Sequence, residues 1–208
     1  MTVPDYRQIR RDLRTAYDVD AERRDGMMKH EWKLAERSAF AARLAEAGLT
    51  RVLEIGAGTG QDSQYFADLG FTVTTTDASP AMVARCRDKG LDARVMDFTD
   101  LSFPAAAFDA VHAMNCLLHV PDADLPAVLT EIARVLRPGG LFFLGVYGGR
   151  DEEGLMESVG DTPPRFFSFR TKEQIENYAT QFFDLVDIHV IPLPNPGEEF
   201  QSLTLRRP

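Results

Sequence analysis

The sequence predicts an α/β protein built on a doubly wound, mostly parallel sheet. Short apolar runs, which are typical of buried parallel strands, alternate with segments of helical periodicity along the first half of the chain. Connections between successive parallel strands are right-handed, so this alternation places helices on both faces of the sheet. A length of 208 residues favours a single domain.

The strands and helices are expected at definite places. The runs that predict strands are residues 51–55, 72–76, 93–95, 110–114 and 141–146. The segments that predict helices are residues 31–47, 61–69, 80–88 and 123–136. Two helix starts carry capping signals, Ser79 before Pro80 and Asp122 before Leu125. The turn RPGG at residues 137–140 is a stop signal for the last of these helices.

Beyond residue 147 the pattern changes. Residues 148–167 predict a long irregular connection with aromatic side chains, in which the acidic run 151–153 forms a solvated turn. A helix is expected over residues 172–181. Residues 183–191 and 201–205 are separated by several prolines and a glycine, which predicts an antiparallel pair that closes the edge of the sheet.

The charge balance restricts the partners. The chain has 23 Lys and Arg against 32 Asp and Glu, a net charge of −9, whereas nucleic-acid binding needs a basic stripe. The longest apolar run, residues 141–147, is far shorter than the ~20 residues of a membrane span, and the N-terminus has no signal-peptide pattern. We therefore expect a cytoplasmic monomer or homodimer that binds a small molecule or short peptide, and neither nucleic acid nor membrane.

The cysteine and histidine residues indicate no metal site. Cys86 and Cys116 lie in apolar or helical patterns, which favours reduced, buried thiols. The four histidines and two cysteines show no metal-ligand spacing, so no metal is expected.

The strongest motif is a glycine-rich turn between a strand and a helix, VLEIGAGTGQD at residues 52–62. Glycines at this point let the backbone approach a ligand at the carboxyl end of a central strand. A dinucleotide fingerprint reads G-x-G-x-x-G and holds a pyrophosphate at the helix N-terminus. This loop has Gln61 in place of the third glycine, and Asp62 would repel the pyrophosphate. A ligand without phosphates fits better.

Three other strand ends are expected to line the same crevice. Asp77 follows the second strand, where a carboxylate can accept the hydroxyl groups of a ribose. Asp97 and Phe98 follow the third, where a carboxylate can take the amino group of adenine. Asn115 follows the strand that lies beside the first. Together these residues predict a nucleoside site at the carboxyl edge of the sheet.

With these motifs, residues 15–147 resemble the class I S-adenosylmethionine-dependent methyltransferases, in particular the small single-domain group with a LEIGAGTG loop and an L-R-P-G-G turn. The resemblance implies a seven-stranded, Rossmann-like sheet whose last strand is antiparallel. It also implies S-adenosylmethionine as the cofactor and S-adenosylhomocysteine as its product. It divides the single domain 1–208 into an N-terminal helical lid (1–48), a cofactor-binding core (49–147) and a substrate-side region (148–208).

The resemblance also assigns roles to residues. Gly56, Ala57, Gly58 and Gly60 would cradle the methionine part above Glu54, and Asp77 would hold the ribose. Ala78 and Met82 would pack near the adenine, and Asp97 and Phe98 would bind its edge. Asn115 and the backbone of Met114 would lie beside the methionine and sulfonium end. Tyr17, in the stretch YDVDA, matches a tyrosine that folds over the cofactor in many relatives.

The activity implied is methyl transfer by in-line displacement to an oxygen or nitrogen of a small molecule or short peptide. Positioning does most of this chemistry, and a base is needed only where the nucleophile must lose a proton. His119 is the one neutral-pH base near the expected crevice, so it is the catalytic candidate. The candidates for substrate contact are Trp32, Tyr147, Arg165 and Phe166.

Three other functions stay open at this point. The glycine loop and Asp77 alone would fit an NAD(P)-linked oxidoreductase, although Gln61 and Asp97 do not. An RNA methyltransferase is disfavoured by the negative charge. A cofactor-binding module without catalysis stays open because methyl transfer needs no obligatory catalytic residue.

Overall fold

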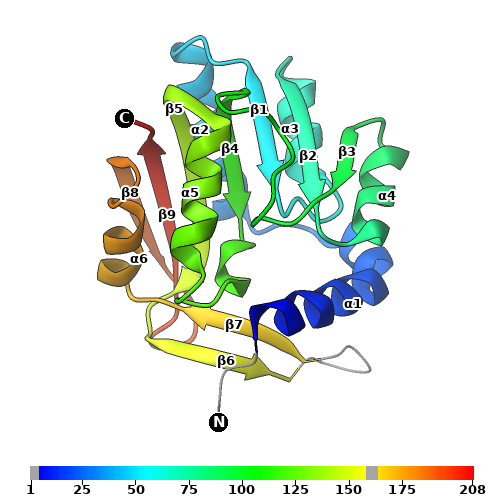
Figure 1. Ribbon diagram of the computed structural model, residues 1–208, viewed down its shortest axis with the longest axis vertical. Coiled ribbons are helices and arrows are strands. Elements are labelled where there is room, and N and C mark those ends of the chain that lie inside the picture. The colour runs from blue at the N-terminus through cyan, green and yellow to red at the C-terminus, as the bar shows by residue number, and fades with distance from the viewer. Residues whose placement is uncertain (1–4, 158–163) are drawn as a thin grey trace.

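The computed structural model describes residues 5–157 and 164–208. Seven strands form one sheet in the order β3-β2-β1-β4-β5-β9-β8. They are β1 (Arg51–Ile55), β2 (Thr72–Asp77), β3 (Asp92–Val95), β4 (Phe108–Met114), β5 (Leu136–Gly148), β8 (Asp184–Pro192) and β9 (Glu199–Arg206). The strand β9, the last in the chain, pairs antiparallel with both of its neighbours, β5 and β8 (Figure 1). The predicted seven-stranded sheet with an antiparallel last strand is confirmed.

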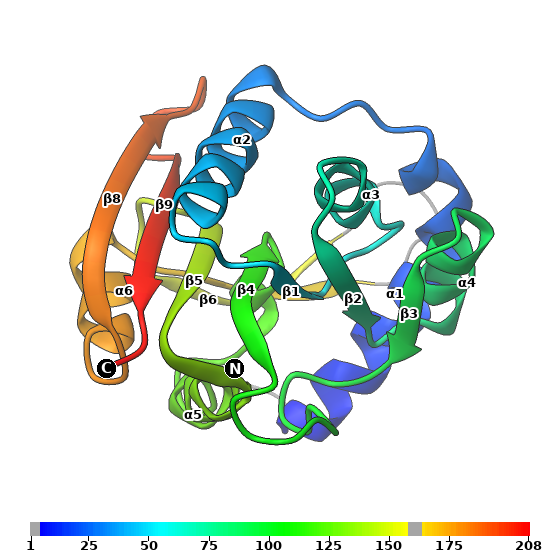
Figure 2. The same ribbon diagram turned by 90° about the horizontal axis from the view of Figure 1, so that it is seen from above.

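Helices cover both faces of the sheet (Figure 2). One face carries α2 (Glu31–Glu46) and α3 (Gln61–Asp68), and the other carries α5 (Leu125–Val135) and α6 (Lys172–Ala179). Neighbouring residues of a strand point to opposite faces, so Phe142 packs in the cluster beneath α5 while Phe143 packs with Phe40 of α2 and Phe66 of α3. The sheet therefore has an apolar core on each side.

The helix α4 (Pro80–Asp88) begins as predicted. The hydroxyl of Ser79 accepts a hydrogen bond from the Met82 amide at 3.1 Å, and Pro80 occupies the first turn. The start of α5 differs from the prediction. Asp124, not Asp122, is its N-cap residue, because the Asp122 carboxylate accepts hydrogen bonds from Arg170 and Ser168 instead. The turn at 137–140 follows the end of α5 directly and already belongs to β5.

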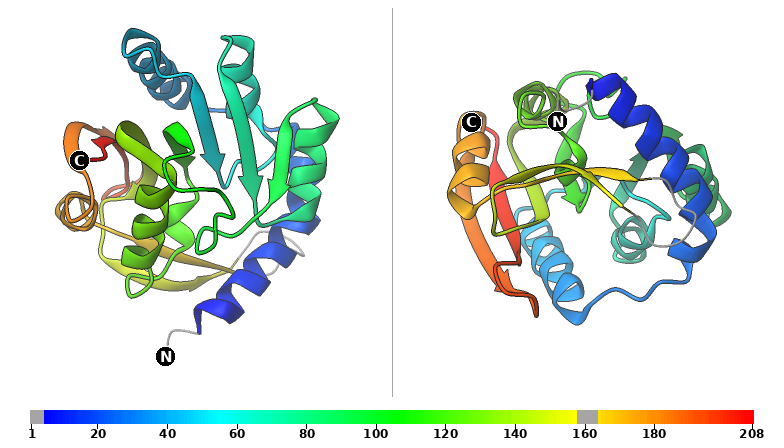
Figure 3. Two further views of the ribbon diagram at one scale, coloured as in Figure 1. Left: turned by 45° about the horizontal axis from the view of Figure 1, so that its top comes forward. Right: turned by 90° about the horizontal axis from the view of Figure 1, so that it is seen from below.

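The carboxyl ends of the parallel strands are covered by two further elements (Figures 1 and 3). One is α1 (Tyr6–Asp25), and the other is an antiparallel pair of β6 (Glu152–Met156) and β7 (Arg165–Phe169). The prediction of an irregular connection over 148–167 was therefore wrong for these residues; residues 158–163 lie outside the described part. The acidic run is not a solvated turn, because Glu152 and Glu153 belong to β6 and Glu153 accepts the Asp122 amide at 2.7 Å.

Both cysteines are buried and unbridged. Of the helices that the structure describes, none is long and apolar enough to cross a bilayer.

Candidate active site

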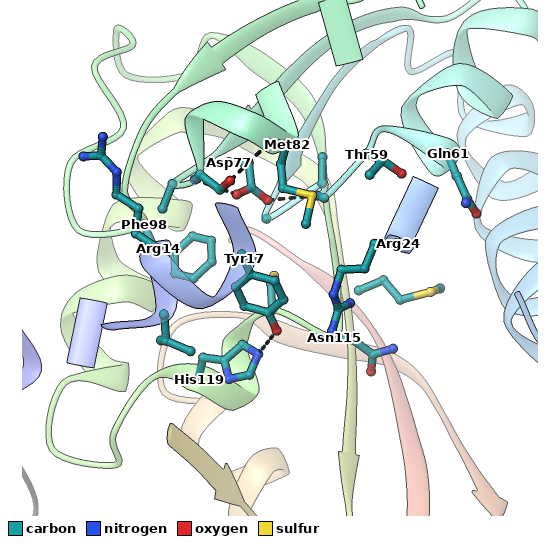
Figure 4. A pocket seen from close by; sticks show the side chains of 18 of the residues that line it. Arg14, Tyr17, Arg24, Thr59, Gln61, Asp77, Met82, Phe98, Asn115 and His119 are labelled. Atoms are coloured by element: carbon teal, nitrogen blue, oxygen red, sulfur yellow. Dashed lines mark hydrogen bonds between the residues drawn. The ribbon is translucent and has the colours of Figure 1, made fainter. Parts of the chain in front are cut away.

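A cavity of about 300 Å³ lies between α1 and the carboxyl ends of the central strands (Figure 4). The strand ends that the sequence predicted to meet do meet here. The predicted cofactor residues that line it are Tyr17, Gly56, Ala57, Gly58, Asp77, Ala78, Met82, Asp97, Phe98, Met114 and Asn115. The volume lies within the range of small-molecule sites.

The Asp77 carboxylate holds the glycine loop in place. One oxygen accepts the Gly58 amide and the other accepts the Ser79 amide, both at 2.8 Å. Burial raises the pKa of Asp77 to about 6. Each carboxylate oxygen can accept a further hydrogen bond, so Asp77 can fix the loop and still bind a ligand.

Glu54 and Gly60 lie beneath the loop rather than in the described lining of the cavity. Glu54 is 3% exposed and accepts a hydrogen bond from Ser63. Its carboxylate, Asp62 and His112 place one ligand-type atom each within 4.8 Å of one another, which the sequence did not predict. Both Asp62 oxygens are already paired, with Lys29 and Arg37. A cation at this cluster would therefore compete with two resident positive charges.

Asn115 brings an unsatisfied acceptor to the cavity. It follows β4 in a left-handed conformation with φ of 56°, and its amide donates to the Gly145 carbonyl at 2.7 Å. Its side-chain oxygen is buried and has no hydrogen-bond partner within the described residues. A buried acceptor without a donor costs about 1–3 kcal/mol, and backbone strain in this region gathers at functional sites. Asn115 therefore points to a ligand that donates a hydrogen bond.

His119 and Tyr17 form a hydrogen-bonded pair on the cavity wall (Figure 4). His119 Nδ1 lies 2.7 Å from the Phe166 carbonyl oxygen, and Nε2 lies 2.5 Å from the Tyr17 hydroxyl. A carbonyl only accepts, so Nδ1 carries the hydrogen and Nε2 accepts from Tyr17. Burial lowers the pKa of His119 to about 4, which keeps the ring neutral. The lone pair of His119 Nε2 accepts the Tyr17 hydroxyl. His119 can therefore take a proton from an acceptor molecule only when Tyr17 no longer donates this hydrogen bond.

Polar contacts tie α1 to three of the loops that surround the cavity. Asp18 accepts the Ser79 hydroxyl at 2.5 Å and the Ala81 amide at 3.1 Å. Arg10 pairs with Asp97 at 2.9 Å. Near the end of α1, Lys89 pairs with Asp25 and donates to the Thr59 carbonyl.

The central part of the chain matches a known family. Residues 52–140 match the model of the methyltransferase domain. A ubiquinone biosynthesis O-methyltransferase of Xanthomonas oryzae pv. oryzae is 43% identical over 110 residues, which are 50% of this chain and 45% of that protein. Over its central part the chain is similar to these methyltransferases. It spans about half the length of the curated relatives it matches.

Solved structures share the methyltransferase fold over more of the chain. The Burkholderia thailandensis 1,6-didemethyltoxoflavin-N1-methyltransferase, solved with 1,6-didemethyltoxoflavin and S-adenosylhomocysteine, has a TM-score of 0.76 at 23% identity and covers 100% of this chain and 92% of its own. The [4+2]-cyclase SpnF has a TM-score of 0.65 at 22% identity and covers 85% of this chain and 82% of its own. At these identities the likeness concerns the fold alone.

The four substrate candidates are placed differently. Tyr147 lines the cavity at the end of β5. Trp32 packs on Phe200, with ring centroids 4.5 Å apart, and is not part of the described lining. Arg165 lies outside that lining too, 5.6 Å from the centroid of the Tyr17 ring. Phe166 is 1% exposed and joins the core, so only its carbonyl reaches His119.

Sequence reasoning missed several residues that line the cavity, among them Arg24 and Lys33. Arg24 donates from Nε to Asp20 at 2.8 Å, and its guanidinium lies 4.7 Å from the Tyr17 ring centroid. Figure 4 shows Arg24 pointing into the cavity, as Asn115 does. No motif spacing marks either cation, because Arg24 belongs to α1 and Lys33 to α2 rather than to the strand ends.

We expect Tyr17 and His119 to be coupled energetically. Replacing Tyr17 by Phe, or His119 by Leu, leaves a buried polar partner unsatisfied, and each change should lower the unfolding free energy by about 1–3 kcal/mol. The double variant should lose less unfolding free energy than the sum of the losses of the two single variants. Urea unfolding of the four proteins measures this, and strictly additive losses would contradict the hydrogen bond.

Proposed function

We propose that this protein transfers a methyl group from S-adenosylmethionine to an oxygen or nitrogen of a small-molecule acceptor. The observation that carries the proposal is the unsatisfied, buried Asn115 oxygen in a cavity that also holds the Asp77 carboxylate. The match of residues 52–140 to the methyltransferase domain model supports the same activity. The names of two similar proteins, an O-methyltransferase and an N1-methyltransferase, support an oxygen or nitrogen acceptor.

The residues present fit the cofactor. The α-ammonium group of its methionine part is a donor that the Asn115 oxygen lacks, and the guanidinium of Arg24 suits the carboxylate beside it. Asp77 would accept the ribose hydroxyls. Met82 and Phe98 offer apolar surface for the adenine, whose amino group Asp97 would accept.

The chain's own part in the reaction is to bind, orient and exclude water. When bound, S-adenosylmethionine would supply a methyl group from its sulfonium sulfur to the acceptor oxygen or nitrogen, and a proton on that acceptor atom would leave to solvent or to a base. Where the acceptor atom is anionic, charge is neutralised as the methyl group moves, so a dry and aligned cavity would favour the transfer. The lid residues 1–48, the core 49–147 and the region 148–208 would contribute cover, cofactor contacts and acceptor contacts within one domain.

The first test is calorimetry on the full chain with three ligands side by side. We expect saturable binding of S-adenosylmethionine and S-adenosylhomocysteine, and none of NADH. Binding of NADH alone would overturn the proposal and favour a redox enzyme.

A further inference from the structure

One cation of the cavity differs from the others in having no counter-charge. Lys33 of α2 lines the cavity, and in the described part of the chain its ammonium has neither a hydrogen bond nor an ion pair. The other arginines and lysines that line the cavity each pair with a carboxylate. These pairs are Arg10 with Asp97, Arg14 with Asp18, Arg24 with Asp20 and Lys29 with Asp62. Lys33 is therefore a cation that lacks a partner inside a ligand cavity.

The surroundings of Lys33 are aromatic. Its ammonium lies 4.7 Å from the Tyr147 ring centroid and 5.2 Å from the Trp32 ring centroid, within the range of cation–π attraction. Burial and the neighbouring Lys29 lower the pKa of Lys33 to about 8. Ring faces replace only part of the water that the ammonium gives up, so an anion that enters the cavity would gain a strong partner.

Lys33 lies at the end of the cavity where an acceptor has to bind. The strands β4 and β5 are paired with Met114 opposite Gly145, and the Asn115 amide donates to the Gly145 carbonyl. Tyr147 is two residues further along β5, on the far side of Asn115 from the glycine loop of β1. In-line displacement requires the nucleophile beyond the methyl group, and Asn115 is the residue proposed to lie at the sulfonium end.

We propose that the acceptor is a planar aromatic molecule with a carboxylate group, held by the Lys33 ammonium beside the Tyr147 ring. Its flat body matches the ring face of Tyr147, which lines the cavity. The carboxylate of the acceptor would neutralise the Lys33 ammonium, which would otherwise lie near the positively charged sulfonium of the cofactor. This inference rests on the methyl transfer proposed above and specifies its substrate class.

The test uses the full chain saturated with S-adenosylhomocysteine. Binding of benzoate, 4-hydroxybenzoate and 3,4-dihydroxybenzoate is compared with binding of their methyl esters by calorimetry. We expect at least one acid to bind about tenfold more tightly than its ester, as a charge-assisted contact predicts. Lys33→Met should abolish this preference, and Lys33→Arg should retain it. Lys172→Met, at a half-buried lysine of α6 that pairs with Glu176 and is not part of the described cavity lining, is the control and should bind the acids and esters as the unchanged protein does.

The outcomes separate this inference from the proposed function. If S-adenosylhomocysteine itself fails to bind, the proposed function falls. If it binds while acids and esters bind equally, or none binds, the substrate class is wrong and the cofactor assignment stands. Arg24→Met should weaken the binding of S-adenosylhomocysteine, whereas Lys33→Met should leave the affinity for S-adenosylhomocysteine unchanged. A loss of cofactor affinity in Lys33→Met would show that Lys33 holds the cofactor carboxylate, and would overturn the inference.

Discussion

Gly56→Ala is expected to lower the unfolding free energy of the ligand-free protein by about 2–5 kcal/mol. A Cβ at Gly56 would lie 2.3 Å from the Cys116 Cβ, and the residue has a φ of 59°. A left-handed conformation costs a residue with a Cβ about 1–2 kcal/mol, and overpacking a buried contact costs about 1–3 kcal/mol more. Urea unfolding with the ligand absent measures the loss.

Gly58→Ala is the matched control, because it shares the conformation but not the crowding. Gly58 has a φ of 57°, and a Cβ there would meet nothing within 4 Å. We expect the unfolding free energy to fall by only about 1–2 kcal/mol, from the strained backbone. The added methyl group should also enter the cavity and weaken the binding of S-adenosylhomocysteine. If both variants unfold at the same urea concentration, the contact between Gly56 and Cys116 is wrong.

Asp77→Ala is expected to weaken S-adenosylhomocysteine binding by about 1–3 kcal/mol, roughly 5- to 150-fold. The change removes the acceptor proposed for the ribose and leaves the Gly58 and Ser79 amides without the partner they now have. Calorimetry gives the affinity, and thermal unfolding of the same variant shows whether the fold survives. An unchanged affinity would exclude Asp77 from the ribose site.

The same carboxylate predicts a pH dependence. Burial raises the pKa of Asp77 to about 6, so below that pH the ligand-free protein increasingly holds it protonated. The proposed ribose contacts need the ionised form as an acceptor. Affinity for S-adenosylhomocysteine should therefore fall as the pH is lowered from 7 to 5. In Asp77→Ala this fall should vanish, and an equal fall in both proteins would assign it to another group.

The regular core was predictable from local signals. The strand β1 and the helix α4 lie where the sequence placed them, because a short, mostly apolar run before a glycine-rich turn and a Ser-Pro start leave few alternatives. The strand ends that carry Asp77, Asp97 and Asn115 follow from the same pattern. Parallel strands bring their carboxyl ends to one edge, so the cavity wall was implied before any contact was known.

The cover over that wall was not predictable. Residues of β7 alternate between buried and half-buried, and the two buried ones are Phe166 and Ser168. Because one is apolar and the other polar, the alternation in burial is not visible as an alternation of apolar and polar residues in the sequence. Arg170 is 2% exposed because Asp122, 48 positions away along the chain, accepts its Nε hydrogen at 2.7 Å. Such pairs depend on the three-dimensional arrangement, which local periodicity does not report.

The continuous segment from α1 to the first turn of α2 lines the cavity at both of its ends. Tyr17 and Arg24 belong to α1, and Lys33 follows within the first turn of α2. We expect a ligand that orders this segment at one end to reduce the entropy that a second ligand must lose at the other. Cofactor and acceptor should therefore bind with positive cooperativity, without any residue that touches both.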